Sequence, residues 1–329
     1  MYKAISSIIG TLLMLIITIG LFGFSYSYIS GVFTSKTSET FSVVDSLNDT
    51  ITISNDGTSV IVNIKATLDG NSVPIAVVPN IQGLVGYWSF NEGSGTTADD
   101  NSDNNNIGTL SPSCPNCPSW ATGKFSTALQ FDGVDDYVDV GTDVSLSPAD
   151  AITLEAWVKR SATGIVSAAI FEKHYNTEYI LAFKSATGEK LEFYSGSGGV
   201  SVLSSTSVTD TTSWHHVVAT YDSTALGKPV KIYLDGKLDN SGSGTSQLGI
   251  TTTNLSIGGQ AGDRFAGALD EVRIYNRALS PEEISSLYSG LVPPGQLATI
   301  KPLASLTTGK HTLKLCSSTM CNTAILTII

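Results

Sequence analysis

The middle of this 329-residue chain is patterned for β-strands. Within "ITLEAWVKR", residues 152–160, apolar residues alternate with others from Ile152 to Lys159. "VKIYLDGK" alternates in the same way and ends in Asp235-Gly236, a pair typical of tight hairpin turns. Because successive side chains of a strand point to opposite faces, a period of two gives each strand one apolar face. The segment from 84 to 288 is therefore expected to form an antiparallel sandwich of two sheets.

Composition supports a folded, acidic β-protein. Hydrophobic residues make up 41% of the chain, which is enough for a core and argues against disorder. Thirty-one glycines indicate many turns, and only 14% of the residues are charged. The net charge is −11 and no basic patch is present, so nucleic acid is not expected as a partner. An acidic surface is compatible with divalent cations.

One segment of the middle region carries clear helix signals. "SPEEISSLY" begins with Ser280, a residue type that caps helices, and continues with Pro281 at the first helical position. Glu282 and Glu283 follow, where negative charge stabilises a helix N-terminus. A short helix is predicted here.

The N-terminus holds a long uncharged run. The 32 residues from Ala4 to Ser35 contain no charged side chain and no histidine. As a helix they would extend for about 48 Å. The hydrocarbon core of a bilayer is about 30 Å thick and needs only ~20 helical residues to span it. The run exceeds the apolar region of a secretory signal, and no Ala-x-Ala ends it. A long α-helix over 5–36 is predicted, either as a plain membrane anchor or in the role that follows.

The sequence "ISSIIGTLLMLIITI" after Lys3-Ala4 resembles the N-terminus of archaeal type IV pilins. The resemblance implies a leader peptide, 1–4, cut between Ala4 and Ile5. It also implies that the retained helix lies first in the membrane and then packs against identical subunits in a helical filament. Bacterial pilins carry Glu at the fifth mature position, where this chain has Ile9.

A second resemblance covers about 205 residues, predicted as a domain over 82–290. It rests on six blocks in order: "GLVGYWSFNEGSGTTADDNSDNNNIGTL", "GKFSTALQFDGVDDYVDV", "ITLEAWVKR", "WHHVVATYD", "VKIYLDGK" and "FAGALDEVRIYNRALSPEEISSLY". Together they are similar to the laminin-G-like, concanavalin A-like jelly-roll family. The resemblance implies two antiparallel sheets, a recognition module that binds carbohydrate, and a structural Ca²⁺.

Asp270 is the predicted calcium ligand. In "LDEVRIY" simple alternation places Asp270 on the face of Val272 and Ile274, where a carboxylate needs a partner or a cation. The resemblance implies further ligands near Asn91 and Gly133. Hard oxygen ligands suit Ca²⁺. The alternative is an aspartate hydrogen-bonded to backbone amides in a turn.

Sugar binding is predicted on the concave sheet, with Trp157 and Glu155 as candidates, and no enzyme is predicted. Glycosidases on this fold carry paired carboxylates along a strand, whereas Glu155 has no second acid. Glu172 precedes the polar segment "KHYNTEY", and Glu178 lies near its end. His215 and His216 are adjacent in a predicted strand, so one of them should point inward, and that one is interpreted as a packed core histidine rather than a base. No serine or cysteine has a credible triad.

The cysteines form two close pairs. Cys114 and Cys117 are predicted to form one disulfide and Cys316 and Cys321 another, since four zinc ligands are not evident. Two sequons begin at Asn48 and Asn254, so both are candidate glycosylation sites.

The remaining segments are predicted to form a small pilin-type β head domain from residues 37–81 and 297–329. Both read as short strands, and an isolated hairpin is marginally stable. The sandwich is then an insertion into the head, with a linker over 291–296. The predicted fold class is mainly β, with a long N-terminal helix, a β head and an inserted jelly roll.

These features predict a cell-surface protein, inserted in the membrane before assembly. The predicted function is a structural subunit of a pilus-like filament that displays the laminin-G-like domain toward surface glycans. Repetition along a fibre would strengthen weak sugar binding. Two alternatives stay open: a membrane-anchored lectin that never polymerises, and an anchored glycoside hydrolase-like enzyme.

Overall fold

The computed structural model describes residues 39–47, 50–61, 64–174, 176–260, 262–292, 294–302 and 306–328. The predicted cleavage point between Ala4 and Ile5, the predicted helix over 5–36 and the sequon residue Asn48 lie outside the described residues. The chain divides into two compact units, here called unit 1 (1–75 with 291–329) and unit 2 (76–290).

The predicted fold class needs a correction. Over the described ranges the fold is mainly β, and its single α-helix is α2 (Pro281–Ser289). No described helix is long and apolar enough to cross a membrane. The predicted fold class is therefore wrong in its long helix, which is not part of the fold that the structure establishes. The described sequence is patterned for short strands joined by turns.

Unit 1 is built from strands at both ends of the chain. It holds β1 (Phe41–Leu47), β2 (Thr50–Asn55), β3 (Lys65–Leu68), β4 (Asn71–Val73), β22 (Leu297–Pro302), β23 (Gly309–Cys316) and β24 (Cys321–Ile328). Strand β2 pairs with β22, so Ile53 lies opposite Ala298. Strand β3 pairs with β23, so Ala66 lies opposite Leu315. Pairing between the two ends of the chain thus forms this unit.

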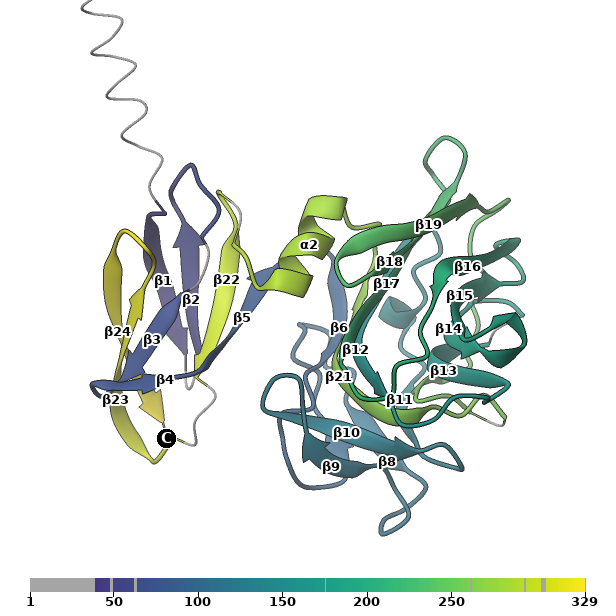
Figure 1. Ribbon diagram of the computed structural model, residues 1–329, viewed down its shortest axis with the longest axis horizontal. Coiled ribbons are helices and arrows are strands. Elements are labelled where there is room, and N and C mark those ends of the chain that lie inside the picture. Colours follow the sequence, from purple (N-terminus) through teal and green to yellow (C-terminus); the bar gives the residue numbers. More distant parts are fainter. Residues whose placement is uncertain are drawn as a thin grey trace, which may run out of the picture. The chain divides into compact units, whose positions relative to one another are not determined.

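Unit 2 is a two-sheet sandwich (Figure 1). Its first sheet has the order β19-β18-β17-β12-β21-β10-β9, with β6 also paired to β21. The members are β6 (Leu84–Trp88), β9 (Ser119–Thr122), β10 (Thr127–Asp132), β12 (Ala151–Arg160), β17 (His215–Asp222), β18 (Pro229–Leu234), β19 (Lys237–Ser243) and β21 (Ala266–Tyr275). Strand β5 (Ile75–Asn80) begins at the boundary between the units.

The second sheet has the order β16-β15-β14-β13-β20-β11-β8-β7. Its strands are β7 (Thr97–Ala98), β8 (Gly108–Ser111), β11 (Tyr137–Gly141), β13 (Ser167–Lys173), β14 (Tyr179–Lys184), β15 (Lys190–Ser195), β16 (Val200–Ser207) and β20 (Leu255–Ile257). Two short 3₁₀ turns, Val144–Leu146 and Ser185–Thr187, join strands of the unit. All strand pairs recorded in unit 2 are antiparallel, as the hairpin-rich sequence predicts.

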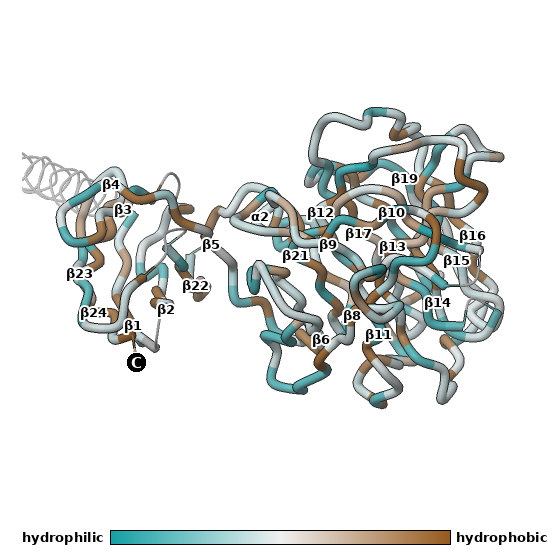
Figure 2. The backbone as a smooth tube through the Cα atoms, turned by 90° about the horizontal axis from the view of Figure 1, so that it is seen from below, coloured by the Kyte–Doolittle hydropathy of each residue, from teal (hydrophilic) through white to brown (hydrophobic). Residues whose placement is uncertain are grey.

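The core of unit 2 lies between the sheets. Ile152, Leu154, Ala156 and Val158 of β12 are all fully buried in it, which confirms the period-two prediction for this strand. Figure 2 shows hydrophobic and hydrophilic stretches interleaved along the chain. The remaining members of the strand face the other side of the first sheet.

Helix α2 covers that outer side of the first sheet. Ser280 Oγ accepts a hydrogen bond from the Glu283 N–H, and the Glu283 carboxylate accepts one from the Ser280 N–H, so the predicted cap is confirmed. Ile284 and Leu287 of the helix are buried against Tyr233 and Tyr275 of the sheet. A second, smaller core therefore lies outside the sandwich.

Candidate functional site

A polar pocket opens at one end of the second sheet of unit 2. Its cavity has a volume of about 220 Å³, and every lining side chain carries a hydrogen-bonding group. The lining residues are Glu172, His174, Asn176, Thr253, Asn254 and Gln260. Glu172 is the last residue but one of β13, and the others come from the loops that follow β13 and flank β20. We call this the Glu172 pocket.

Among the described residues, Glu172 is the only carboxylate that lines the pocket. Its Oε2 atom accepts a hydrogen bond of 2.8 Å from the Gln260 N–H, which fixes the side chain toward the loop after β20. Burial raises the pKa of the Glu172 carboxyl, and the nearby Asp263 carboxylate adds to this rise. The remaining oxygen is available to a ligand as an acceptor.

A buried ion pair holds the two pocket loops together from behind. Lys173 Nζ donates a 2.6 Å hydrogen bond to the Thr253 carbonyl and lies 3.8 Å from Glu178 Oε1. Both charged side chains are fully buried. Glu178 Oε1 also accepts a 2.8 Å hydrogen bond from the Thr251 N–H. A charge pair in this position fixes the loop on each side of the pocket before any ligand arrives.

The loop after β13 begins with a backbone conformation that is unusual for a non-glycine residue. His174 has a φ of +47°, in the left-handed region. Its carbonyl accepts hydrogen bonds of 2.8 Å from the N–H groups of Thr177 and Glu178. This turn exposes the His174 side chain at the pocket rim. Backbone strain of this kind is concentrated at binding loops.

Asn254, predicted as a glycosylation site, belongs to the pocket wall. Its amide nitrogen donates to both carboxylate oxygens of Asp139, at 2.7 and 2.9 Å. Attachment of a glycan to this nitrogen would remove one of its two hydrogens and so break at least one of those hydrogen bonds. The amide thus orients the wall of the pocket in the unmodified chain.

The predicted ligand contacts Trp157 and Glu155 require a correction, because both side chains are buried. Trp157 is 2% exposed and stacks on Tyr288 of α2 at 5.6 Å between ring centres, while Lys124 Nζ lies 4.3 Å from its ring centre. Glu155 is fully buried. The prediction placed them on the sheet opposite that of Asp270, whereas β12 pairs directly with β21 in the first sheet. They lie on the outer face of that sheet, which α2 covers.

Glu155 takes part in a buried charged network instead. Its Oε1 atom lies 2.9 Å from Arg273 Nη1 and 3.1 Å from His216 Nε2. Arg273 also binds the Glu271 carboxylate, which accepts a 2.9 Å hydrogen bond from the Tyr87 hydroxyl. The two glutamates are thus bridged by one guanidinium group and shielded from solvent. This position suits a role in stabilising the fold rather than in catalysis.

Asp270 is fully buried, but it does not lie on the predicted face. The inner core contains Leu269, Val272 and Ile274. Two residues, Asp270 and Glu271, separate the first two of these, and Glu271 has a φ of +53°. The register with β12 shifts at this point. A β-bulge therefore reverses the alternation and turns Asp270 away from the inner core.

The surroundings of Asp270 fit a cation in part. Its Oδ2 atom accepts a 2.8 Å hydrogen bond from the Phe125 N–H, while Oδ1 has no hydrogen-bond partner among the described residues. Burial raises the pKa of this carboxyl well above its usual range, and the Glu271 charge adds to the rise. A cation or a proton would satisfy the orphaned oxygen.

Of the two other predicted calcium ligands, one lies close to the Asp270 loop. Asn91 Oδ1 accepts a 3.3 Å hydrogen bond from the Thr127 N–H, two residues beyond Phe125. Gly133 instead packs on Ala266, four residues before Asp270 on β21. Four residues of strand extend for about 13 Å, so Gly133 is not brought to Asp270.

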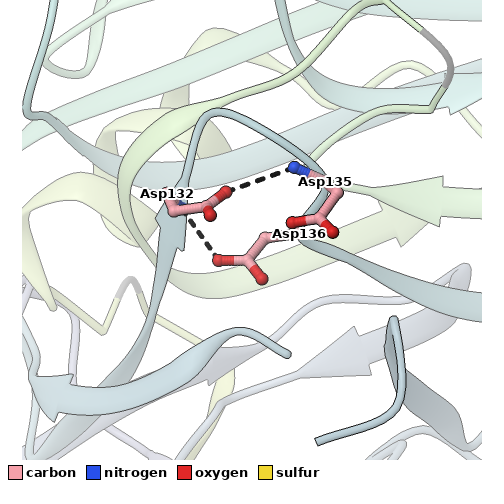
Figure 3. Close-up of side chains that lie close together, drawn as sticks. All are labelled: Asp132, Asp135 and Asp136. Atoms are coloured by element: carbon pink, nitrogen blue, oxygen red, sulfur yellow. Dashed lines mark hydrogen bonds between the residues drawn. The ribbon is translucent and has the colours of Figure 1, made fainter. Parts of the chain in front are cut away.

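Gly133 belongs to a separate acidic turn, shown in Figure 3. Carboxylate oxygens of Asp132, Asp135 and Asp136 lie within 4.8 Å of one another. Asp132 Oδ1 accepts a hydrogen bond from the Asp135 N–H, and Asp136 Oδ2 accepts one of 2.8 Å from the Asp132 N–H. Burial raises the pKa of Asp136 to about 6, with its two acidic neighbours contributing. Its internal hydrogen bonds make this a self-supporting turn.

Both predicted disulfides are confirmed. Cys114 bonds to Cys117, and Cys316 bonds to Cys321, and no described cysteine is free. The second bond joins residues that lie opposite each other in the β23–β24 hairpin. Two disulfides indicate an oxidising, extracellular compartment.

Comparison with known proteins agrees with this geometry. Residues 132–285 match the laminin G family model described as the concanavalin A-like lectin/glucanases superfamily. Unit 2 therefore contains a laminin-G-like jelly-roll domain. An 87-residue stretch is 30% identical to the sushi, von Willebrand factor type A, EGF and pentraxin domain-containing protein 1 of Rattus norvegicus. It covers 23% of this chain and 2% of that protein.

Solved structures show the same fold for the laminin-G-like domain. Domain 4 of AbnA, an extracellular arabinanase of Geobacillus stearothermophilus, was solved in complex with arabinotriose. The likeness has a TM-score of 0.50 at 18% identity and covers 62% of this chain and 98% of that one. The binding domain of Paraclostridial Mosquitocidal Protein 1 also has a TM-score of 0.50 at 18% identity, and this likeness covers 63% of this chain and 52% of that one. At this identity the likeness shows the fold alone.

Sequence patterns single out only two of the six pocket residues. Glu172 stands out as a carboxylate beside "KHYNTEY" and Asn254 as the first residue of a sequon. The others lie in loops that are distant in sequence and meet only in the folded domain. The signal that could have found them is the polar, aromatic run "KHYNTEY" between two strands, since binding residues are often carried by loops on a rigid scaffold.

Proposed function

We propose that the laminin-G-like domain is a non-catalytic module that binds a short oligosaccharide in the Glu172 pocket. The observation that carries this proposal is a pocket lined throughout by hydrogen-bonding side chains and held by the buried Lys173–Glu178 pair. A sugar presents several hydroxyl groups, each of which donates and accepts. The arabinotriose bound to AbnA domain 4 supports the ligand class on the same fold.

The chemistry of the pocket favours a neutral glycan. Glu172 supplies an acceptor, while the side-chain amides of Asn176 and Gln260 supply both donors and acceptors. Asp263 lies near Glu172 and influences its pKa, so the region is acidic. A uronic acid or sulfated sugar would be repelled by these carboxylates and by the net charge of −11.

Binding rather than hydrolysis is proposed because the pocket lining includes only one carboxylate. Glycoside hydrolysis ordinarily requires two, placed about 5–9.5 Å apart across the scissile bond. The glutamates Glu155 and Glu271 are bridged by Arg273 and buried under α2. A glycan could not reach that pair without displacement of the helix.

The proposal is tested by screening the full-length chain, kept in detergent, against a panel of immobilised neutral and acidic oligosaccharides. We expect binding to one class of neutral glycan, with at least a tenfold loss in the Glu172→Ala and Asn176→Ala variants. Glu192→Ala is the matched control, since Glu192 lies on the same sheet and bonds only to Ser201. Equal binding by Glu172→Ala and wild type would refute the assignment of the pocket.

A structural Ca²⁺ at Asp270 forms a second part of the proposal. The supporting observation is the orphaned, buried Oδ1 atom beside the loop that also contacts Asn91. Oxygen ligands from the carboxylate and from this neighbourhood suit the ion. Bound there, Ca²⁺ would hold β21 to the segments on either side of Asn91 and Phe125.

The wider setting of the domain is also proposed here. The two disulfides and the lectin-like fold support an extracellular position. The prediction that the chain is a filament subunit depends on residues 1–36, which lie outside the described residues. N-terminal sequencing of the native chain tests it: a start at Ile5, together with surface filaments in electron micrographs, is the expected result. An intact Met1 on assembled chains would contradict it.

A further inference from the structure

A second cavity lies between the end of β16 and the β18–β19 hairpin. Strands β16 and β19, the edge strands of the two sheets, lie side by side (Figure 1). The volume of the cavity is about 530 Å³. One wall is the end of β16 with the following residues up to Asp210, and the other is the β18–β19 hairpin. Hydrogen bonds from the Ser205 and Thr206 N–H groups to Asp239 join these walls. His215 lies between them at the start of β17.

Only one of the two ring nitrogens of His215 has a hydrogen-bond partner among the described residues. Its Nδ1 atom lies 3.0 Å from Asp235 Oδ2, so Nδ1 carries the proton and donates it to the carboxylate. Asp235 is held in turn, because its Oδ1 atom accepts a 3.0 Å hydrogen bond from the His216 N–H. With Nδ1 protonated, the lone pair of a neutral ring lies on Nε2. Nε2 has no hydrogen-bond partner among the described residues.

The atom that faces Nε2 is Asp210 Oδ2, at 3.6 Å. The other oxygen of Asp210 is already satisfied by the Thr212 N–H and hydroxyl, both at 2.7 Å, and by the Ser213 N–H at 3.3 Å. Hydrogen bonds from Ser213 and Thr212 hold the pKa of Asp210 well below its usual range. The group is therefore an anion, and its second oxygen lies 3.6 Å from a His215 nitrogen that has no hydrogen-bond partner among the described residues.

We infer that His215 Nε2 and Asp210 Oδ2 bind a divalent transition-metal ion such as Zn²⁺. Two ligand atoms 3.6 Å apart can both reach one ion at about 2.0–2.1 Å, with an angle near 120° at the metal. Asp235 then takes the place of the carboxylate that orients a metal-bound histidine through its other nitrogen. Waters in the adjoining cavity would complete the coordination.

The charge around the cavity supports a dication. Among the described residues, its lining includes three carboxylates and one ammonium group, from Asp210, Asp235, Asp239 and Lys237. These side chains carry a net charge of −2 when His215 is neutral. Imidazole nitrogen with carboxylate oxygen suits Zn²⁺ better than Ca²⁺, which prefers oxygen ligands only. The site is thus distinct in chemistry from the acidic turn and from Asp270.

Isothermal titration of the EDTA-treated full-length chain with Zn²⁺, in excess Ca²⁺ to fill oxygen-only sites, tests this inference. One ion per chain is expected to bind in the wild type. His215→Gln should abolish that binding, Asp210→Asn should weaken it at least tenfold, and Asp235→Asn should weaken it 10- to 100-fold.

His311→Gln is the matched control. His311 also bonds to a carboxylate through Nδ1, to Asp69 at 2.7 Å, but its Nε2 is taken by the Thr307 carbonyl at 2.8 Å. This variant should bind Zn²⁺ like the wild type. Melting curves in EDTA check that each variant folds. If His215→Gln fails to fold, anomalous scattering from a Zn²⁺-soaked wild-type crystal decides, with a peak expected between His215 and Asp210. Absence of that peak, or unchanged binding by His215→Gln, would leave an ion pair only and overturn the inference.

Discussion

Lys173 and Glu178 form an ion pair with no solvent exposure, and the pair lies between the two loops that carry the Glu172 pocket. Removal of one partner leaves an uncompensated buried charge, which typically costs 3–5 kcal/mol. Lys173→Met and Glu178→Leu alone should therefore destabilise unit 2 by about that amount, as measured by urea denaturation.

The double variant is the informative control for this pair. Because two apolar side chains avoid the desolvation of two charges, Lys173→Met with Glu178→Leu should recover most of the lost stability. It should nevertheless weaken glycan binding, since the hydrogen bonds to Thr253 and Thr251 are lost. Additive destabilisation in the double variant would show that the two charges are not coupled.

The acidic turn predicts a pH-dependent stability. Burial raises the pKa of Asp136 to about 6 from an unfolded value of 3.8. The neutral carboxyl is thus favoured in the fold, and this contribution is fully present below pH 4 and is lost as the pH rises through 6. Asp136→Asn should be more stable than wild type at pH 8, by on the order of 1–2 kcal/mol, and no more stable at pH 4.

Melting temperatures between pH 4 and 8, in EDTA, give the test for Asp136. Asp103→Asn, which changes an exposed acid in another loop, is the control and should show no such divergence from wild type. A constant difference between Asp136→Asn and wild type at all pH values would argue that Asp136 titrates normally.

Several elements follow from local sequence alone. The alternation over 152–158 predicts the inner face of β12, and the Ser280–Glu283 cap predicts α2, because both depend on neighbouring residues. The face of Asp270 does not follow, since a single extra residue at the Glu271 bulge reverses the alternation. The burial of Trp157 does not follow either, because α2 reaches it only through the tertiary fold.

Calcium should stabilise the laminin-G-like domain through Asp270. At a hundred times its dissociation constant, a bound ion adds about 2.7 kcal/mol, which corresponds to a rise of several degrees in melting temperature. The rise should disappear in Asp270→Ala and persist in Asp103→Ala, which changes an exposed acid in another loop. An equal calcium response in Asp270→Ala would assign the ion to a different site.

The Cys316–Cys321 disulfide should affect unit 1 alone. Its ring closes only six residues of chain, so the loss of chain entropy in the unfolded state amounts to about 2 kcal/mol. Replacement of both cysteines by serine should speed hydrogen exchange of β23 and β24 and leave unit 2 unchanged. The same replacement at Cys114 and Cys117 is the matched control, with effects confined to unit 2. Faster exchange in both units would indicate coupled unfolding.

The central claim is that the Glu172 pocket binds a neutral oligosaccharide. Its most direct test is a titration of the ¹⁵N-labelled chain with the best glycan of the panel, followed by amide chemical shifts. The account predicts saturable shifts at Glu172, Asn176, Thr253 and Gln260, with Trp157 unaffected beneath α2. Saturable shifts confined to another surface, or none for any glycan of the panel, would contradict it.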